Sequence, residues 1–216
     1  MLAIFDVEGV LLDAEYLPIL AEKINKQDEI WEITRKGIKG VINWEDGLKT
    51  RINTLRGISY DTCKEIADSL PIMIGAKEAC SALKRAGWKL LAISGGFSIM
   101  TDRLKKELDL DYVFSNELIF KDGKLDDVVI HVDSDKAKSA MIKVNEWKEK
   151  KEDIVTVVDG ANDIKLFNIC GLGVAFRAQD IVKDLATVTL EEKDLSLLID
   201  IINKHFGMKL ELQTMA

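Results

Sequence analysis

The first apolar run of the chain, residues 2–5, ends abruptly in Asp6, and Glu8 and Gly9 follow within three positions. A buried parallel strand brings such a residue to the carboxyl edge of a sheet, where open α/β folds bind ligands. Glu8 lies on the same side of an extended chain, and Gly9 allows the backbone to turn away. Asp6 is therefore a candidate catalytic residue, although a strand followed by a solvated acidic turn explains this stretch equally well.

A second apolar run, residues 154–158, ends in the same way at Asp159, with Asp163 four positions later. If both runs are neighbouring parallel strands, Asp6, Asp159 and Asp163 meet at one edge of the sheet. Carboxylates held together repel one another unless a cation relieves them, and oxygen ligands with room for water suit Mg²⁺. A solvated acidic rim is the alternative, but it does not explain why two separate strands end alike.

A third apolar run, residues 88–93, leads into Ser94, Gly95 and Gly96. Glycines let backbone N–H groups approach an anion, a helix start adds positive partial charge, and a serine hydroxyl adds a donor. The stretch has the outline of a phosphate cradle. Taken alone, a generic strand-to-helix turn is the better explanation, because Ser-Gly-Gly is a common loop sequence.

Lys136 and Lys138 stand at the start of an expected helix just before the run at 154–158. Most surface lysines serve solubility, and that explanation suffices for this pair on its own. A site that holds a phosphoryl group and several acids nevertheless needs a cation to offset charge in the transition state. The residues alone leave open which lysine would serve.

The composition excludes several classes of protein. A hydrophobic content of 47% with 31% charged residues is that of a globular protein with a proper core, and the net charge of −7 argues against nucleic acid or an anionic membrane as main partner. No apolar stretch approaches the roughly 20 residues of a membrane helix, and the N-terminus lacks a signal-peptide pattern, so we expect a cytoplasmic protein. The three cysteines, Cys63, Cys80 and Cys170, are far apart and outside any metal or disulfide pattern.

The pattern along the chain predicts an α/β fold with a helical insertion. Residues 12–70 show apolar spacing typical of helices and almost no strand signal, whereas from Pro71 onward helices and strands alternate, which predicts a doubly wound parallel sheet. Asp122-Gly123 favours a β-hairpin near 117–131. We expect a core at 1–13 and 71–206, an all-helical cap at 14–70, and a tail at 207–216 without clear pattern. The expected core elements are helices near 75–86, 97–108, 137–149, 162 onward, 178–185 and 194–206, and strands near 88–93, 112–114, 154–158, 173–176 and 187–190.

Taken in order, the strand-Asp-x-Glu-Gly, strand-Ser-Gly-Gly, lysine and Asp-Gly-x-x-Asp stretches resemble the motifs of the haloacid dehalogenase superfamily of phosphohydrolases. The resemblance narrows to the phosphoserine phosphatase family over roughly residues 2–206, with support from residues 42–51, 93–97, 118–124 and 159–163. The helical insertion after the first strand is similar to the small cap of that family. The resemblance implies a Rossmann-like core, Mg²⁺ as cofactor and a small phosphorylated amino acid as substrate, acted on by a monomer or homodimer.

The resemblance also implies roles for individual residues. Asp6 would be the nucleophile that forms an aspartyl-phosphate, and Glu8 the general acid and then the base, with its backbone carbonyl on the metal beside Asp6 and Asp159. Asp163 would help to bind the metal directly or through water. Of the two lysines, Lys138 is preferred because Lys138-Ser-Ala-Met-Ile keeps an apolar pair at the family's helix positions. The residues implied to hold the phosphoryl group or the substrate are Ser94, Gly95, Lys138 and Asn162.

Phosphoserine carries an ammonium and a carboxylate besides its phosphate, so a selective site needs one further anion and one further cation. Glu15 and Arg51 match the family's positions for those roles, and Trp44 falls where the family has an aromatic cap residue. Each could also be an ordinary cap residue, but the joint presence of Glu15 and Arg51 favours an amino acid substrate.

The chain departs from the family pattern at Glu8, where most members have Asp, at Val10, where they have Ser or Thr, and at Val158, where they have Gly. The extra methylene of Glu8 displaces the carboxyl group by about 1.5 Å, enough to change the rate. Related proteins with Asp-x-Glu-Gly are associated with phosphoryl transfer to homoserine as well as hydrolysis. A phosphotransferase or another small-molecule phosphatase is therefore one alternative, and a non-catalytic phosphoamino-acid sensor is another.

Overall fold

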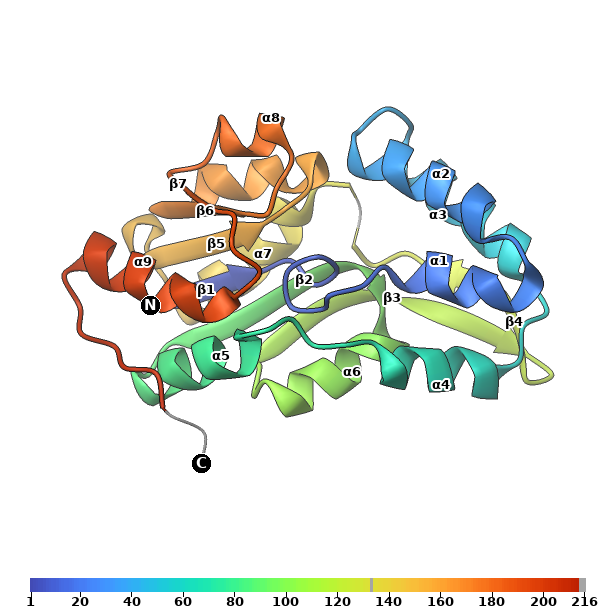
Figure 1. Cartoon of the computed structure of the whole chain (residues 1–216), viewed down its shortest axis with the longest axis horizontal. Helices are drawn as coiled ribbons and strands as arrows, with labels where there is room; N and C mark the ends of the chain where they lie inside the picture. Colours follow the sequence, from blue (N-terminus) through green and yellow to red (C-terminus); the bar gives the residue numbers. More distant parts are fainter. Residues whose placement is uncertain (133, 214–216) are drawn as a thin grey trace.

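The protein is built on one mixed sheet, seen in a computed structural model that describes residues 1–132 and 134–213 (Figure 1). Within these residues, seven strands follow the order β4-β3-β2-β1-β5-β6-β7, and only β4 runs antiparallel to its neighbour. The strands are β1 (Leu2–Phe5), β2 (Lys89–Phe97), β3 (Tyr112–Lys121), β4 (Lys124–Val129), β5 (Ile154–Val158), β6 (Leu172–Phe176) and β7 (Val188–Leu190).

The sheet is buried on both faces, because successive side chains of a strand point to opposite sides. In β1, Ala3 and Phe5 belong to one hydrophobic cluster, whereas Leu2 and Ile4 belong to a second cluster on the other face. The first cluster is covered by α5 (Ala76–Arg85), α6 (Ser98–Glu107) and α9 (Leu198–Phe206), and the second by α7 (Lys136–Trp147), α8 (Asp180–Lys183) and the 3₁₀ segment η3 (Ala161–Ile169). The doubly wound α/β fold predicted from the sequence is confirmed.

The structure differs from the predicted elements in three places. Strand β2 continues through the Ser-Gly-Gly stretch to Phe97, so α6 begins at Ser98 and the glycines lie in extended backbone rather than in a turn. Strand β3 runs without a break from Tyr112 into the hairpin, whose second arm, β4, ends at Val129. The segment after Asp159 forms a 3₁₀ helix instead of an α-helix.

The stretch after β1 is helical, as predicted. It contains α1 (Tyr16–Ala21), η1 (Glu22–Ile24), α2 (Gln27–Ile38), α3 (Trp44–Leu55) and α4 (Tyr60–Ser69). The two chain crossings between this stretch and the sheet are bonded to each other, since Asp13 N donates to Pro71 O at 2.9 Å and Met73 N to Leu11 O at 2.9 Å. The division into core and cap at these crossings remains a prediction, because the buried side chains of the helices pack in one cluster with a face of the sheet.

The β3–β4 hairpin is attached to the helical stretch by backbone hydrogen bonds. Leu125 O accepts from Gly57 N and Leu125 N donates to Ile58 O, both at 2.8 Å, and Tyr60 N donates to Gly123 O at 2.8 Å. These bonds pin the loop between α3 and α4 to the end of the sheet. Figure 1 shows β4 beside α3 and the start of α4.

The chain beyond α9 returns to the core. Asn203 Nδ2 donates to Leu210 O at 2.9 Å, and Leu210 N donates to Asn203 Oδ1 at 2.7 Å, so the first part of the predicted tail is bonded to α9. Residues 214–216 of that tail lie outside the described residues. Among the described helices, none is both long enough and apolar enough to cross a membrane.

Candidate active site

Asp6 lies at the carboxyl edge of the sheet, one residue beyond β1. Phe5 pairs with Ala92 of β2 and with Val157 of β5, so the ends of three parallel strands are level at this point. The Asp6 side chain is largely buried, and its Oδ1 accepts a hydrogen bond of 2.7 Å from Val7 N. One backbone donor thus fixes the carboxylate at the centre of the edge.

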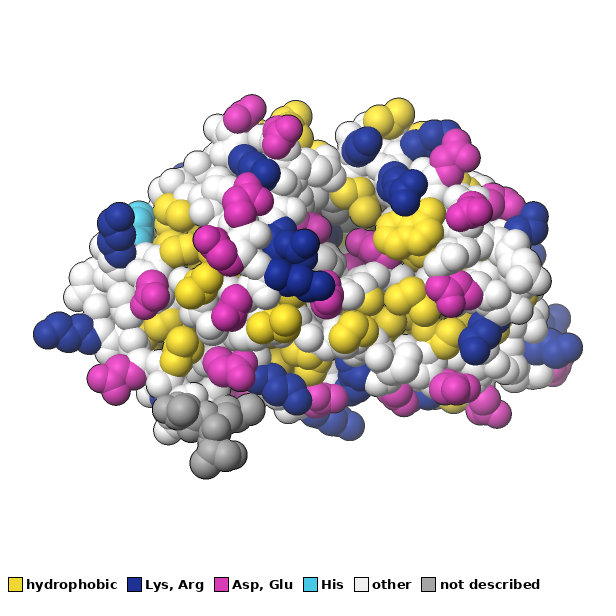
Figure 2. Space-filling model, viewed as in Figure 1, with side chains coloured by type: hydrophobic (Ala, Val, Ile, Leu, Met, Phe, Trp, Pro, Cys, Tyr) yellow, Lys and Arg dark blue, Asp and Glu magenta, His cyan; other side chains and the backbone are white. Residues whose placement is uncertain are grey.

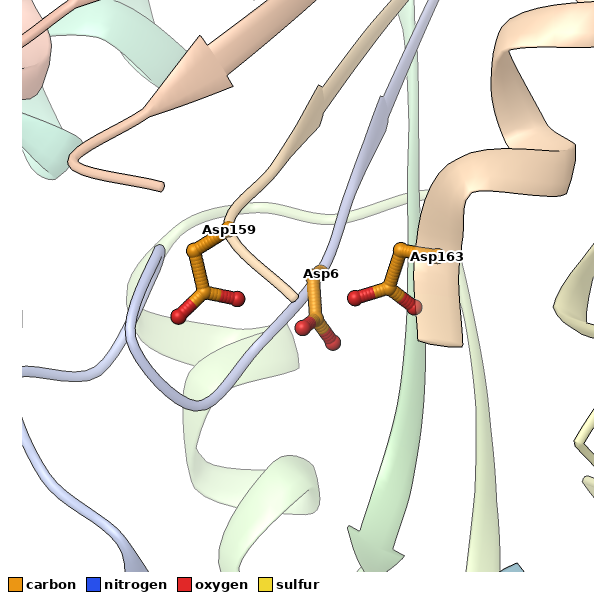
Figure 3. Close-up of side chains that lie close together, drawn as sticks. All are labelled: Asp6, Asp159 and Asp163. Carbon is orange, nitrogen blue, oxygen red and sulfur yellow. The ribbon is translucent and has the colours of Figure 1, made fainter. Parts of the chain in front are cut away.

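Asp6, Asp159 and Asp163 converge on one point, as their sequence positions predicted. Each offers an oxygen within 4.8 Å of the others, and Figure 3 shows the three carboxylates from β1, the end of β5 and η3 turned toward a common centre. Burial, followed by repulsion from Asp6, raises the pKa of Asp159 well above its usual range and that of Asp163 to about 8. The negative charges of the three carboxylates repel one another, and a hard cation bound between them would offset this repulsion.

Two further observations fit a cation at this cluster. Among the described residues, no hydrogen-bond partner reaches the buried Oδ2 of Asp163, and a buried carboxylate oxygen without a partner is destabilising. Gly9 has φ +84°, and a Cβ at this position would lie 2.2 Å from Asp159 Oδ2. Glycine therefore gives the Asp159 carboxylate the space that it occupies, and the all-oxygen donor set suits a hard divalent ion.

Lys136, the first residue of α7, brings a cation to the acids. Its Nζ lies 2.7 Å from Asp6 Oδ1 and 2.7 Å from Asp163 Oδ1, and the residue is only 4% exposed. Burial lowers the pKa of the Lys136 ammonium, but attraction to Asp163 and Asp6 outweighs burial and raises the pKa above its usual range. The ammonium is therefore charged at all ordinary pH values.

The preference for Lys138 is corrected by this geometry. Two positions along a helix turn a side chain by about 200°, so Lys136 and Lys138 cannot both face the acids. The first turn of α7, in which Lys138 N donates to Asp135 O at 3.1 Å, gives the inward position to Lys136. The apolar pattern used to align the helix with the family placed the lysine two residues too late.

Glu8 is held by the start of α1. Its Oε1 accepts a hydrogen bond of 2.7 Å from Tyr16 N, and burial is the largest cause that raises the Glu8 pKa, with Asp6 adding to it. A Cβ at Gly96 would lie 2.8 Å from Glu8 Oε2, so this glycine leaves room for the glutamate carboxylate. The longer side chain is therefore ordered and faces the space between β2 and the acids.

The predicted phosphate cradle is only partly exposed to the site. Gly95 and Gly96 line the cavity next to Asp6, but Ser94 is completely buried and its Oγ accepts from Gly96 N at 2.9 Å. In this structure Ser94 thus holds the backbone of Gly96 in place and is not itself exposed to the cavity. Asn162 lines the cavity from η3, and its Nδ2 lies 3.4 Å from Asp163 Oδ1.

The helices after β1 close the cavity with the three residues predicted for substrate binding. Glu15, Trp44 and Arg51 all line the same cavity as the acids and Lys136. Asn43 caps α3 by accepting from Asp46 N at 3.0 Å, which starts the helix that carries Trp44 and Arg51. Figure 2 shows a hollow between α2 and the part of the core that carries α8, with acidic side chains beside it.

The electrostatics of this wall fit a zwitterion. Burial, followed by repulsion from Glu8 and Asp159, raises the pKa of Glu15 well above its usual range. Burial lowers the pKa of the Arg51 guanidinium, and attraction to Glu8 and Glu15 opposes this effect. The half-buried acid Glu15 and the buried Arg51 thus line one cavity, and among the described residues no ion pair joins them.

Sequence analysis missed Thr34 and Ile38, which line the cavity from α2. Thr34 is 2% exposed and follows Ile30 by one helical turn on the buried side of α2. A hydroxyl on an otherwise apolar stripe was the available signal.

Comparison with known proteins identifies the class first. A family model for haloacid dehalogenase-like hydrolases matches residues 1–171. The chain therefore belongs to the haloacid dehalogenase-like hydrolases.

Individual relatives narrow the family. Phosphoserine phosphatases from Archaeoglobus fulgidus and Methanocaldococcus jannaschii are 36% and 34% identical to the chain over 90% of its length. The chain spans 57% of the first protein and 93% of the second. A solved substrate-bound phosphoserine phosphatase complex and a phospho-aspartyl intermediate analogue of phosphoserine phosphatase each match with a TM-score of 0.88 at 32% identity, over 93% of this chain and 97% of theirs. Within its class, the chain belongs to the phosphoserine phosphatase family of phosphoric monoester hydrolases.

Proposed function

We propose that the protein is a Mg²⁺-dependent phosphomonoesterase that hydrolyses L-phosphoserine to L-serine and phosphate through an aspartyl-phosphate on Asp6. The observation that carries the proposal is a single cavity with two chemically different ends. The core end presents Asp6, Lys136 and the other acids, and the helical end presents Glu15 and Arg51. The names of the similar proteins support the same substrate.

The chemistry follows from Asp6 and Glu8, the two acids of the site that lie two positions apart in the sequence. Asp6 is the nucleophile: its carboxylate oxygen bonds to phosphorus while the bond between phosphorus and the serine oxygen breaks. Glu8, whose pKa is raised, gives its proton to that leaving oxygen. Glu8 then accepts a proton from a water molecule, whose oxygen bonds to phosphorus as the bond to Asp6 breaks, which releases phosphate and restores both groups.

Charge neutralisation supplies much of the rate, because a carboxylate is a weak nucleophile toward a phosphate dianion. Lys136 Nζ beside Asp6 Oδ1 provides positive charge, and the backbone N–H of Gly95 provides a donor for the phosphoryl oxygens. A Mg²⁺ ion would be held by Asp6, Asp159, Asp163 and the Glu8 carbonyl, and would offset the remaining charge. Ser94 supports the glycine backbone, and Asn162 helps to place the phosphate.

Substrate selection is assigned to the helical wall. Glu15 receives the ammonium of phosphoserine, Arg51 receives its carboxylate, and Trp44 covers the site against water. With this activity the protein would act in serine biosynthesis. The sequence also predicts that it is cytoplasmic and that it is a monomer or a homodimer.

The proposal is tested by phosphate release from L-phosphoserine with Mg²⁺, measured beside a panel of sugar and nucleotide phosphates. We expect the highest kcat/KM for L-phosphoserine, and no turnover by Asp6→Asn. Acid-quenched wild-type protein should carry hydroxylamine-labile phosphate from labelled substrate, and Asp6→Asn should not. Preference for a sugar or nucleotide phosphate would reject the substrate, and absence of labile phosphate on an active enzyme would reject the intermediate.

Phosphoryl transfer is a second candidate function, favoured by one observation. Glu8 takes the place of the usual Asp and is oriented by Tyr16 N, so an alcohol could replace water as the acceptor. Adding homoserine to the assay and measuring phosphohomoserine against phosphate separates the two activities. A sensor without catalysis would instead bind phosphoserine equally in the wild type and Asp6→Asn, with turnover by neither.

A further inference from the structure

The guanidinium of Arg51 is fixed by two hydrogen bonds from separate helices. Nε donates to Gly47 O at 3.2 Å within α3, and one Nη donates to Thr34 Oγ1 of α2 at 3.0 Å. Thr34 is 2% exposed and Arg51 is 9% exposed. A planar guanidinium that is held at Nε and at one Nη cannot rotate in its plane, so its remaining donors keep one direction.

Both acceptors are neutral, so the guanidinium keeps its positive charge for a ligand. Within the described residues, the hydrogen bonds of Arg51 end on a hydroxyl and a carbonyl, and neither removes its positive charge. A carboxylate in place of Thr34 would pair with Arg51 and leave less charge for a ligand. Thr34 therefore orients the cation and keeps it available to an anion in the cavity, which both residues line.

Packing alone does not explain a threonine at this position. The buried side of α2 includes Ile30, Thr34 and Gly37, and a valine would fill the same volume as Thr34 without a polar atom. A hydroxyl in such a place is destabilising unless it is bonded, and its partner here is Arg51. The bond also ties α2 directly to α3 beside the cavity that both residues line.

We propose that Thr34 is a positioning residue that holds Arg51 for the carboxylate of the substrate, so that it determines selectivity for amino acid phosphates. The proposal rests on the proposed function of the cavity. Loss of the hydroxyl frees the guanidinium and weakens binding of the carboxylate, whereas the chemistry at Asp6 is affected less. The predicted signature is a change in KM that depends on a carboxylate in the substrate.

The test compares wild type, Thr34→Val and Thr34→Ser on O-phospho-L-serine and on O-phosphoethanolamine, which has the ammonium but no carboxylate. For Thr34→Val we expect KM for phosphoserine to rise about fivefold to twentyfold, the range of one lost charge-assisted hydrogen bond, with a smaller change in kcat. KM for phosphoethanolamine should rise much less. Thr34→Ser, which keeps the hydroxyl, should recover most of the affinity for phosphoserine.

Two controls separate positioning from general damage. Thr50→Val changes an exposed threonine beside Arg51 on α3, whose Oγ1 donates to Asp46 O at 2.8 Å, and should leave both substrates unaffected. In an Arg51→Met background, Thr34→Val should cause no further rise in KM for phosphoserine, because its effect passes through Arg51. If Thr34→Val folds poorly, Thr34→Ala gives the same comparison between the two substrates.

The outcomes distinguish this proposal from the proposed function. If wild type does not prefer phosphoserine to the wider panel, both fall. If wild type prefers phosphoserine but Thr34→Val changes KM for both substrates equally, or changes neither, the positioning role is rejected and the function stands. An equal loss in Thr34→Ser and Thr34→Val would also reject it.

Discussion

Lys136 Nζ lies 2.7 Å from Asp6 Oδ1, although the two residues are 130 positions apart in the sequence. The contact joins the first residue of α7 to the end of β1 at the middle of the sheet edge. Because Asp163 Oδ1 lies at the same distance from Nζ, one ammonium serves two of the three acids.

Replacing Lys136 by Met should therefore lower kcat/KM for phosphoserine by about 10²-fold to 10³-fold, as loss of one charge that stabilises a transition state usually does. Lys138→Met should lower it by less than about tenfold, because the first turn of α7 directs Lys136 to the acids. Steady-state kinetics of the two variants at one Mg²⁺ concentration make the comparison. A larger loss for Lys138→Met would show that the lysine was assigned to the wrong position.

Glu8→Gln tests the proton transfer. The variant keeps the side-chain length and an acceptor for Tyr16 N but cannot donate a carboxylic proton. We expect kcat for phosphoserine to fall by about 10²-fold to 10⁴-fold, the usual contribution of general acid–base catalysis. Formation of the phosphoenzyme from p-nitrophenyl phosphate, whose leaving group needs no proton, should be slowed much less in a rapid-quench experiment. Equal slowing with both substrates would contradict the role.

Gly9→Ala tests the space beside Asp159. A Cβ there would meet Asp159 Oδ2 at 2.2 Å, so the carboxylate has to move and the Mg²⁺ concentration for half-maximal activity should rise. The left-handed backbone alone costs an alanine about 1–2 kcal/mol of stability. Gly57→Ala is the matched control, since Gly57 has φ +90° and open space at its Cβ position. It should lose similar stability in urea unfolding and keep the wild-type Mg²⁺ requirement.

Asp111 gives a pH-dependent contribution to stability. Burial opposes ionisation, but Leu90 N at 2.7 Å and Lys84 Nζ at 3.0 Å outweigh it and hold the pKa of Asp111 below its usual value. A lowered folded-state pKa means that the contribution is present above the pKa of the unfolded chain and is lost as pH falls through the folded-state pKa. Asp111→Asn should thus lower the free energy of unfolding at pH 7 by about 1 kcal/mol, a figure already reduced for solvent screening.

The effect of Asp111→Asn should shrink as pH falls below about 4, where the unfolded chain is protonated. Asp109→Asn is the control. The Asp109 side chain is 82% exposed, and its carboxylate lies 3.7 Å from Nζ of the same lysine, Lys84, farther than that of Asp111. Urea unfolding between pH 3 and pH 7 measures both variants. A difference between wild type and Asp111→Asn that stays constant over this range would contradict the assignment.

The doubly wound parallel sheet and the meeting of the three acids could be predicted from the sequence, because both follow from local rules. Apolar runs ending in Asp6 and Asp159 define strand ends, and parallel strands share one carboxyl edge. The choice between Lys136 and Lys138 could not be made in this way, since it depends on where the first turn of α7 starts.

The hydrogen bond between Thr34 and Arg51 could not be predicted from the sequence either. The bond joins α2 to α3. The relative rotation of the two helices depends on how they pack against each other, which the sequence of neither segment determines alone. The extension of β2 through Gly96 has a similar origin: pairing of Phe97 with Asn116 of β3 keeps the glycines extended, where local propensity favours a turn.

The hairpin bonds to the loop between α3 and α4 have a mechanical consequence. Leu125 and Gly123 hold this loop through three backbone hydrogen bonds, each worth roughly 1 kcal/mol, so it is a third attachment besides the two chain crossings. Swinging all four helices away as one body would break this attachment. Trp44 and Arg51 on α3 therefore belong to a fixed wall of the cavity rather than to a lid that moves away from it.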